Sequence, residues 1–184
     1  MNDESGSARP PRQRSPFDRI LGHQYTVFDG LAGMQVEDIY QDQRGLLWIA
    51  TADGGVSRFD GAHFDTFGLS DGLPSLTVMT IAEDQDGRLL FGTLGGGLAA
   101  YDGRGFQVYT TEHGLPSNDI LGLQSQADGS IRVLTDAGIG WFVEGRCVER
   151  VTEIVGQPLG RVFDMATDAT GTTWLATLKW GSLA

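Results

Sequence analysis

Glycine recurs in this sequence with a fixed period of 42 residues, and this period constrains the fold more than any other feature. The first glycine column consists of Gly30, Gly72, Gly114 and Gly156, each 42 positions after the one before it. Three further columns keep the same register: Gly45, Gly87, Gly129 and Gly171; Trp48, Leu90, Arg132 and Trp174; Thr51, Thr93, Thr135 and Thr177. A period of about 40–45 residues is typical of propeller blades and of helical solenoids. Helices are excluded, because no stretch of about a dozen residues has helical apolar spacing without an intervening Gly or Pro.

Each repeat contains four short runs of residues that favour β-structure, and each run ends at a turn. In the first repeat the runs are 36–42, 46–52, 56–60 and 63–68. The Asp60-Gly61 pair suits a tight hairpin, because Gly adopts positive φ at little cost. The second run is continuously apolar, which indicates a strand buried on both faces. The sequence therefore predicts an all-β fold, a β-propeller with four-stranded antiparallel blades, in which the Trp columns pack between blades.

The repeats also predict the boundaries of the domain. Blades are expected at 36–68, 78–110 and 120–152, with a partial blade at 162–184. About three and a half blades result, so the propeller is expected to be incomplete and the chain a fragment. The segment 23–28 is interpreted as an outer strand that would close the fourth repeat. Residues 1–22, rich in Gly, Ser, Pro and Arg, are predicted to form a disordered tail.

Composition limits the partners and the compartment. The chain has 184 residues, with 13 Lys and Arg against 24 Asp and Glu, a formal net charge of −11. This charge argues against binding to nucleic acid or to an anionic membrane surface. The sequence has no apolar run of the roughly 20 residues that a spanning helix needs and no recognisable signal peptide, so it reads as cytoplasmic. Cys147 is the single cysteine, and we expect it to be inert.

The repeat resembles the two-component regulator propeller family. The resemblance rests on residues 39–51 and 54–61, and on two inter-blade loops, 71–75 and 113–118. These loops read Asp-Gly-Leu-Pro-Ser and His-Gly-Leu-Pro-Ser-Asn, similar to the Gly-Leu-Pro-Ser-Asn turn of that family. Through the repeat, the resemblance extends over nearly everything from residue 23 onward.

The resemblance implies a non-catalytic, ligand-binding sensor segment that feeds a histidine kinase or a similar output module. It implies an unknown small-molecule or glycan ligand, and a signalling output domain or partner protein. Sensors of this family often face the periplasm. The alternative is a stand-alone small propeller of four blades, closed by the segment 23–28, that acts as a protein-interaction scaffold.

No motif in the sequence favours catalysis, a cofactor or a metal. His23, His63 and His113 lie in expected strands or turns, whereas a phosphoacceptor His needs a helix. The glycine-rich run 92–97 lacks the Lys that follows a phosphate loop, and it connects two strands. Residues 84–87 resemble the start of a calcium loop, but Thr93 stands where a bidentate Glu is needed. We therefore predict no catalytic residues, no cofactor and no metal site.

Ligand-binding residues are expected on the loops at one end of the blades. There the turns between second and third strands converge with the connections between blades. The candidate ligand-binding residues are Asp53, Asp71, His113, Asp136, Lys179 and Trp180.

Overall fold

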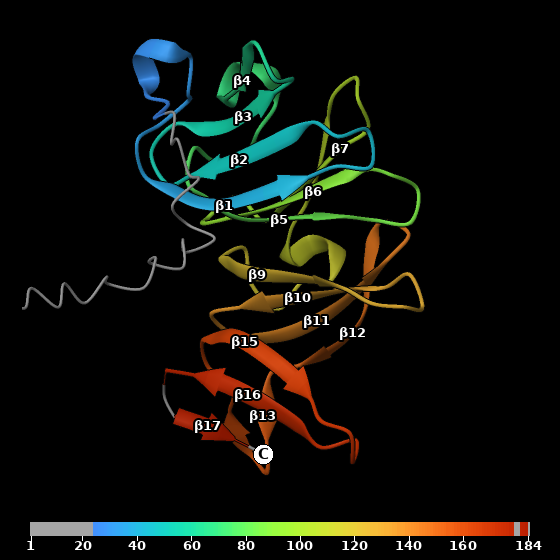
Figure 1. The fold of residues 1–184 in the computed structure, drawn as a ribbon. Helices are drawn as coiled ribbons and strands as arrows, with labels where there is room; N and C mark the ends of the chain where they lie inside the picture. Colours follow the sequence, from blue (N-terminus) through green and yellow to red (C-terminus); the bar gives the residue numbers. More distant parts are fainter. Residues whose placement is uncertain (1–23, 179–180, 184) are drawn as a thin grey trace, which may run out of the picture.

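The computed structural model describes residues 24–178 and the backbone of residues 181–183. The expected tail over 1–22 and two of the candidate ligand-binding residues, Lys179 and Trp180, lie outside the described residues. The described chain is built from four consecutive antiparallel blades, with a separate two-stranded hairpin between the third and the fourth (Figure 1). Its connections include short 3₁₀ turns. No helix in the described part is long and apolar enough to cross a membrane.

The predicted fold class, a propeller of four-stranded antiparallel blades, is confirmed. Blade 1 consists of β1 Val36–Gln41, β2 Leu47–Thr51, β3 Gly55–Phe59 and β4 Phe64–Phe67. Blade 2 consists of β5 Val78–Glu83, β6 Leu89–Thr93, β7 Leu98–Tyr101 and β8 Phe106–Tyr109. Blade 3 consists of β9 Ile120–Ser125, β10 Ile131–Thr135, β11 Gly138–Val143 and β12 Arg146–Val151. Blade 4 has three strands in the described part, β15 Val162–Thr167, β16 Thr173–Thr177 and β17 Gly181–Leu183.

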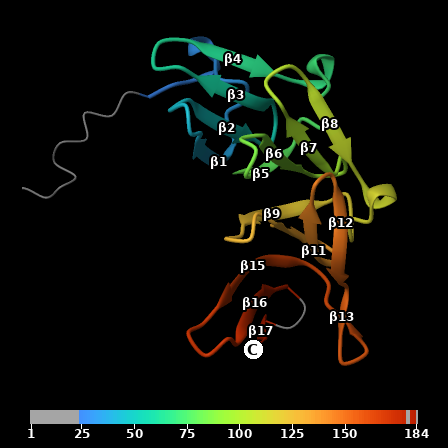
Figure 2. The ribbon, with the colours of Figure 1, turned by 90° about the vertical axis from the view of Figure 1, so that its right-hand side faces the viewer.

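The blades stack face to face in an open arc, so the fold is an incomplete β-propeller. The first strands of successive blades are neighbours, because β5 contacts β1 and β9, and β15 contacts β9. Figure 2 shows these strands along the inner side of the arc, with β8 and β12 on the outer side. The sheet of blade 4 does not pair with any segment of blade 1. The described residues thus form the open arc expected of an incomplete propeller and do not form the alternative closed ring of four blades.

The 42-residue period reflects hydrogen bonds that recur from blade to blade. The Thr51 hydroxyl donates to the carbonyl oxygen of Gly55 at 2.9 Å, and Thr93 and Thr135 make the same bond across their own turns. Each of these threonines is fully buried. At the opposite end of the blade, Gly45 takes a φ of 84° and its N–H donates to the Asp42 carbonyl at 2.8 Å. Positive φ favours glycine at this turn.

The hydrophobic core lies between blades. Trp48 is 0% exposed and packs with Phe67, Phe91 and Tyr101 at the interface of blades 1 and 2. Leu90 lies in the same column of blade 2 and belongs to the cluster between blades 2 and 3. A blade therefore presents one face of its second strand to the blade before it and the other to the blade after it. This confirms that the Trp48 column serves packing between blades.

The segment 23–28 does not form the expected strand. In its described part, residues 24–26 have no regular structure and Val27–Asp29 form a 3₁₀ turn, η2. The physical reason is the cap: the backbone N–H and hydroxyl of Thr26 both donate to Asp29, and Gly30 ends the turn at a φ of 106°. The same turn recurs 42 residues later as η3 Leu69–Asp71 and again as η4 Thr111–His113. In the fourth repeat a short hairpin takes its place, formed by β13 Glu153–Ile154 and β14 Gln157–Pro158, which the sequence did not predict.

Candidate functional site

In a four-stranded antiparallel meander, the turn after the second strand and the connection after the fourth strand lie at the same end. We call this end of the blades the loop face. It consists of the connections 29–35, 68–77, 110–119 and 152–161 and of the turns 52–54, 94–97 and 136–137. It carries the four described candidates, Asp53, Asp71, His113 and Asp136. No hydrogen bond or ion pair within the described residues joins any two of them.

Asp53 anchors the start of blade 1. Its two carboxylate oxygens accept hydrogen bonds from the backbone N–H groups of Met34 and Gln35, both at 3.3 Å. The bonds tie the turn after β2 to the segment that enters β1. Gly33 must stay small for this contact, because a Cβ at that position would collide with the carboxylate of Asp53 and with Thr51. Asp53 therefore has a structural role in positioning the loop face.

Asp71 and His113 cap the 3₁₀ turns that join one blade to the next. The backbone N–H of Gly68 donates to Asp71 Oδ2 at 2.9 Å, and that of Thr110 donates to His113 Nδ1 at 3.1 Å. Asp29 caps η2 in the same way. His113 thus replaces a carboxylate with a ring nitrogen, which accepts the same bond when the proton sits on Nε2. His113 therefore has the same structural role as Asp29 and Asp71, which stand in its column in the preceding repeats.

Asp136 differs from the other candidates, because its side chain has an unpartnered oxygen. One of its carboxylate oxygens is buried and has no hydrogen-bond partner within the described residues. Its backbone N–H donates to the carbonyl of Asp119 at 3.2 Å, the bond that Ala52 and Leu94 make in blades 1 and 2. Blade 3 therefore has a carboxylate where the earlier blades have an apolar side chain. Buried polar atoms in folded proteins almost always have a hydrogen-bond partner, so this oxygen singles out Asp136 among the candidates.

Asp119 is a loop-face residue that the sequence analysis missed. Its Oδ1 accepts a hydrogen bond from the backbone N–H of Gly95 at 2.6 Å, which links blade 2 to blade 3. In the preceding junction Thr77, one period earlier, donates its hydroxyl to the Ala52 carbonyl at 2.9 Å. Both residues stand two positions after the serine of a Gly-Leu-Pro-Ser loop. The signal available in the sequence was their spacing of 42 residues, because both positions hold a polar side chain that forms a hydrogen bond between two blades.

At the opposite end of the blades, Asp42 and Asp84 are hydrogen-bonded to other side chains of this chain. The indole N–H of Trp48 donates to Asp42 Oδ2 at 3.0 Å, and Arg44 lies at the same oxygen at 3.0 Å. Burial disfavours the ionised form of Asp42, but hydrogen bonds from Trp48, Leu46 and Arg44 outweigh burial and hold its pKa below the usual value. Asp84, at the resembled calcium loop, instead accepts from Arg88 Nε at 2.8 Å.

Two further observations concern metal ligands and the single cysteine. The described residues contain no group of three or more His, Cys, Asp or Glu that could hold a metal ion. Burial raises the pKa of the Cys147 thiol, and Cys147 Sγ donates to the carbonyl of Glu149 at 3.0 Å. A raised pKa leaves less of the nucleophilic thiolate at neutral pH.

The two ends of the arc each carry an apolar hollow. The outward face of blade 1 forms a hollow of about 220 Å³ lined by Tyr25, Leu31, Val36, Ile39, Leu47, Ile49, Phe59 and Phe64. The outward face of blade 4 forms one of about 170 Å³, lined by residues that include Asp164, Trp174 and Ala176. None of the four described candidates lines either hollow. The structure thus separates a polar loop face from two apolar terminal faces.

Comparison with known families finds a match for part of the repeat. The two-component regulator propeller model matches residues 30–53 and 72–95, two stretches one period apart. Two successive repeats of this chain thus match that family. Each match runs from the glycine that ends a 3₁₀ turn, through the first two strands of a blade, into the turn after its second strand. Among curated proteins, none matches the sequence significantly.

Solved structures confirm the fold. One is the extracellular domain of a proposed hybrid two-component system from B. thetaiotaomicron, with 24% identity and a TM-score of 0.64 over 77% of this chain and 20% of that chain. A second is the extracellular domain of a proposed one-component system from B. thetaiotaomicron, with 22% identity and a TM-score of 0.65 over 80% of this chain and 22% of that chain. The chain thus spans about a fifth of the length of these two structures.

An enzyme has the same architecture. Virginiamycin B lyase from Staphylococcus aureus aligns with a TM-score of 0.58 at 15% identity, over 76% of this chain and 48% of the lyase. At this identity the likeness concerns the fold alone, and a fold by itself does not assign an activity.

Proposed function

We propose that this chain is a ligand-binding segment of a sensory propeller that belongs to a two-component signalling protein. In this proposal the loop face binds the ligand, and a histidine kinase or a similar output module receives the signal. The observation that carries it is the match of two consecutive repeats to the two-component regulator propeller family. The likeness of the fold to two extracellular domains of proposed signalling proteins supports the same assignment.

Charge indicates the class of ligand. The chain has a net charge of −11, and the loop face carries Asp53, Asp71, Asp119 and Asp136. A polyanion would be repelled at this face, whereas the hydroxyl groups of a neutral sugar can donate to carboxylate oxygens. One carboxylate oxygen of Asp136 has no hydrogen-bond partner within the described residues, which makes Asp136 the first candidate for such a contact. We therefore assign the ligand to neutral glycans.

A thermal-shift screen of the protein with neutral oligosaccharides tests this proposal. The probes are cellohexaose, xylohexaose, mannohexaose and chitohexaose, and hits are measured again by isothermal titration calorimetry. We expect at least one sugar to raise the melting temperature of the wild-type protein and to bind Asp136→Asn more weakly. Asp86→Asn is the matched control, because Asp86 is exposed in the turn between β5 and β6 at the opposite end.

Three results would contradict the proposal: no sugar binds, Asp136→Asn binds as the wild type does, or Asp86→Asn alone loses binding. Mass spectrometry of the recovered sugar provides a second readout. A sensor returns the sugar unchanged, whereas shortened or unsaturated products would show an enzyme.

A further inference from the structure

The outward face of blade 1 repeats a surface that is buried elsewhere in the molecule. We call this surface the front face; its residues are Val36, Ile39, Leu47 and Ile49. One period later the same columns hold Val78, Ile81, Leu89 and Phe91, which are all at most 5% exposed and pack against blade 1. On the front face, Ile39 is 61% exposed and Val36 is 42% exposed. The front face thus has the side chains of a blade interface, but no blade among the described residues packs on it.

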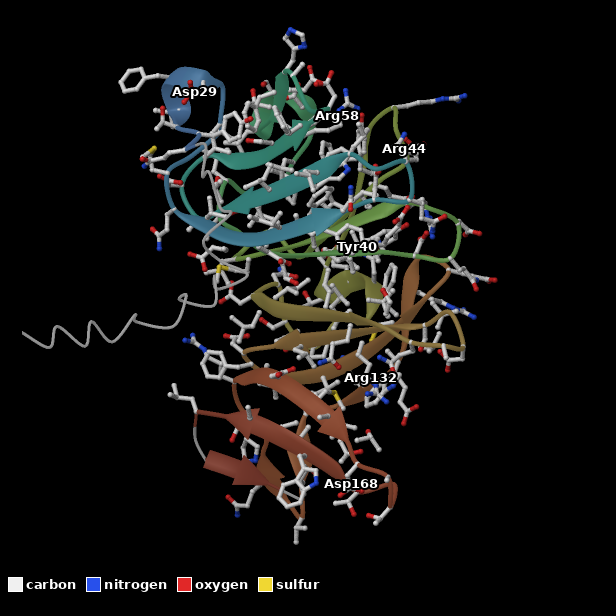
Figure 3. The ribbon with its side chains drawn as sticks, viewed as in Figure 1. Asp29, Tyr40, Arg44, Arg58, Arg132 and Asp168 are labelled. Atoms are coloured by element: carbon white, nitrogen blue, oxygen red, sulfur yellow. The ribbon has the colours of Figure 1, made fainter. Side chains whose placement is uncertain are left out.

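The outward face of blade 4 repeats the other half of that interface. We call it the rear face; its residues are Ala166, Trp174 and Ala176. They occupy the columns of Tyr40, Trp48 and Ala50, which pack against blade 2. Trp174 donates its indole N–H to Asp168 at 3.0 Å, as Trp48 does to Asp42, and Figure 3 shows Asp168 at the blade 4 end of the arc. Trp48 is 0% exposed, whereas Trp174 is 47% exposed.

The segment before blade 1 lies where the end of a fourth strand packs in the later repeats. Tyr25 lies 5.1 Å from Phe59 between ring centroids, and one period later Phe67, at the end of β4, lies 5.3 Å from Tyr101. The contact recurs a third time between Tyr109, at the end of β8, and Phe142 at 4.8 Å. Tyr25 therefore packs on blade 1 as the last residue of a fourth strand packs on the following blade.

We propose that two copies of this chain associate head to tail, with the rear face of one copy packed against the front face of the other. In this arrangement the three strands of blade 4 meet the Tyr25 segment of the second copy, which lies at the fourth-strand position. The blade interfaces already present inside the chain supply the template for this contact. The inference goes beyond the proposed sensory function and does not depend on it.

A repeated polar contact fits the same register. Asp38 in β1 accepts a hydrogen bond from the backbone N–H of Ile81 in β5 at 2.8 Å, across the interface of blades 1 and 2. Asp164 occupies the Asp38 column in blade 4, and Ile39 occupies the Ile81 column in blade 1. Head-to-tail packing therefore brings Asp164 of one copy to the backbone of Ile39 in the other. Such a contact between unlike faces gives a closed ring of two copies if the rotation closes, and a filament otherwise.

The test combines two variants that each damage one face. Ile39→Lys places a charge on the front face, and Trp174→Glu places one on the rear face. Val148→Lys is the matched control, because Val148 is 53% exposed on β12, away from both faces. Ala176→Lys provides a second rear-face variant in case Trp174→Glu perturbs blade 4, and circular dichroism checks the fold of each protein.

Sedimentation velocity over a concentration series gives the readout. We expect the wild type and Val148→Lys to have at least twice the mass of one chain, and each face variant alone to be monomeric. A mixture of Ile39→Lys with Trp174→Glu or Ala176→Lys should form a one-to-one pair, because one intact front face and one intact rear face remain. A monomeric wild type would overturn the proposal, and so would face variants that associate like the wild type or a mixture that stays monomeric.

Discussion

Replacing Trp48 with alanine tests whether the interface between blades stabilises this fold. Trp48 is 0% exposed, its ring packs within 5.6 Å of Phe67, Phe91 and Tyr101 between centroids, and its indole N–H bonds to Asp42. The chain offers a matched position, since Trp174 makes the same hydrogen bond in the same column but is 47% exposed. A comparison of the two substitutions therefore isolates burial between blades from the local bond.

The expected magnitudes follow from the buried area. A fully buried Trp removes roughly 200 Å² from water, which at roughly 25 cal/mol per Å² corresponds to about 5 kcal/mol. This lies at the upper end of the loss of about 3–5 kcal/mol usual for such truncations. About half of Trp174 is buried, so its area contributes about 2.5 kcal/mol. We expect Trp48→Ala to cost about 2–3 kcal/mol more than Trp174→Ala.

Urea unfolding followed by far-ultraviolet circular dichroism measures the difference. Both substitutions are made in the Ile39→Lys background and at concentrations where sedimentation shows monomers, so that self-association does not bury Trp174. Unfolding is also followed by tryptophan fluorescence, because repeat proteins can unfold in more than one step. Equal losses at the two positions, or a loss below about 1 kcal/mol at Trp48, would refute the argument that the blade interface forms the core.

Three further predictions concern single contacts. Asp42→Asn should destabilise the protein at pH 7. Because the pKa of Asp42 is lowered on folding, its contribution to stability is present above about pH 4 and is lost as the pH falls through the folded value. Urea titrations of the wild type and the variant should therefore show a difference at pH 7 that shrinks at pH 3. His113→Ala should cost about 1 kcal/mol by removing the acceptor of the Thr110 N–H, whereas His113→Asp should keep the cap, as thermal melting of the two variants will show. Gly92→Ala should cost about 1–3 kcal/mol, because its Cβ would lie 2.6 Å from Ile120 and Thr80 side chains, while Gly105→Ala, with open space around it, should leave the melting temperature almost unchanged. A larger loss of stability for His113→Asp than for His113→Ala, or for Gly105→Ala than for Gly92→Ala, would contradict these assignments.

The sequence predicted the blades to within a few residues, because the repeat supplies four readings of the same strand pattern. It failed where a position deviates from its column. The segment 23–28 was expected to be an outer strand like β4. In the structure, η2 in this segment lies 42 residues before η3, so the segment corresponds to the turn that follows β4. Local cap chemistry at Thr26 and Asp29 decides this, and a strand pattern alone does not reveal it.

The roles of the loop-face residues were harder to predict, because the sequence does not distinguish a polar residue that caps a turn from one that binds a ligand. Asp53 and Asp71 proved to hold backbone N–H groups, which only coordinates can show. Asp136 stands out in the structure because its oxygen is buried without a partner, a property of packing that the sequence does not contain. Asp119 was missed because its hydrogen bond crosses between two blades.

Blade 3 departs from the repeat at two positions that blades 1 and 4 share. In the column of Trp48 and Trp174, blade 3 has Arg132, which lies between blades 3 and 4 in Figure 3 and has a buried Nε without a hydrogen-bond partner in the described part of the chain. In the column of Asp42, blade 3 also departs, with Gln126 in place of the carboxylate. The Asp–Trp bond is thus lost at both partners together. Blades 1 and 4 keep it, and these are the blades whose outward faces complete one another in the head-to-tail pair.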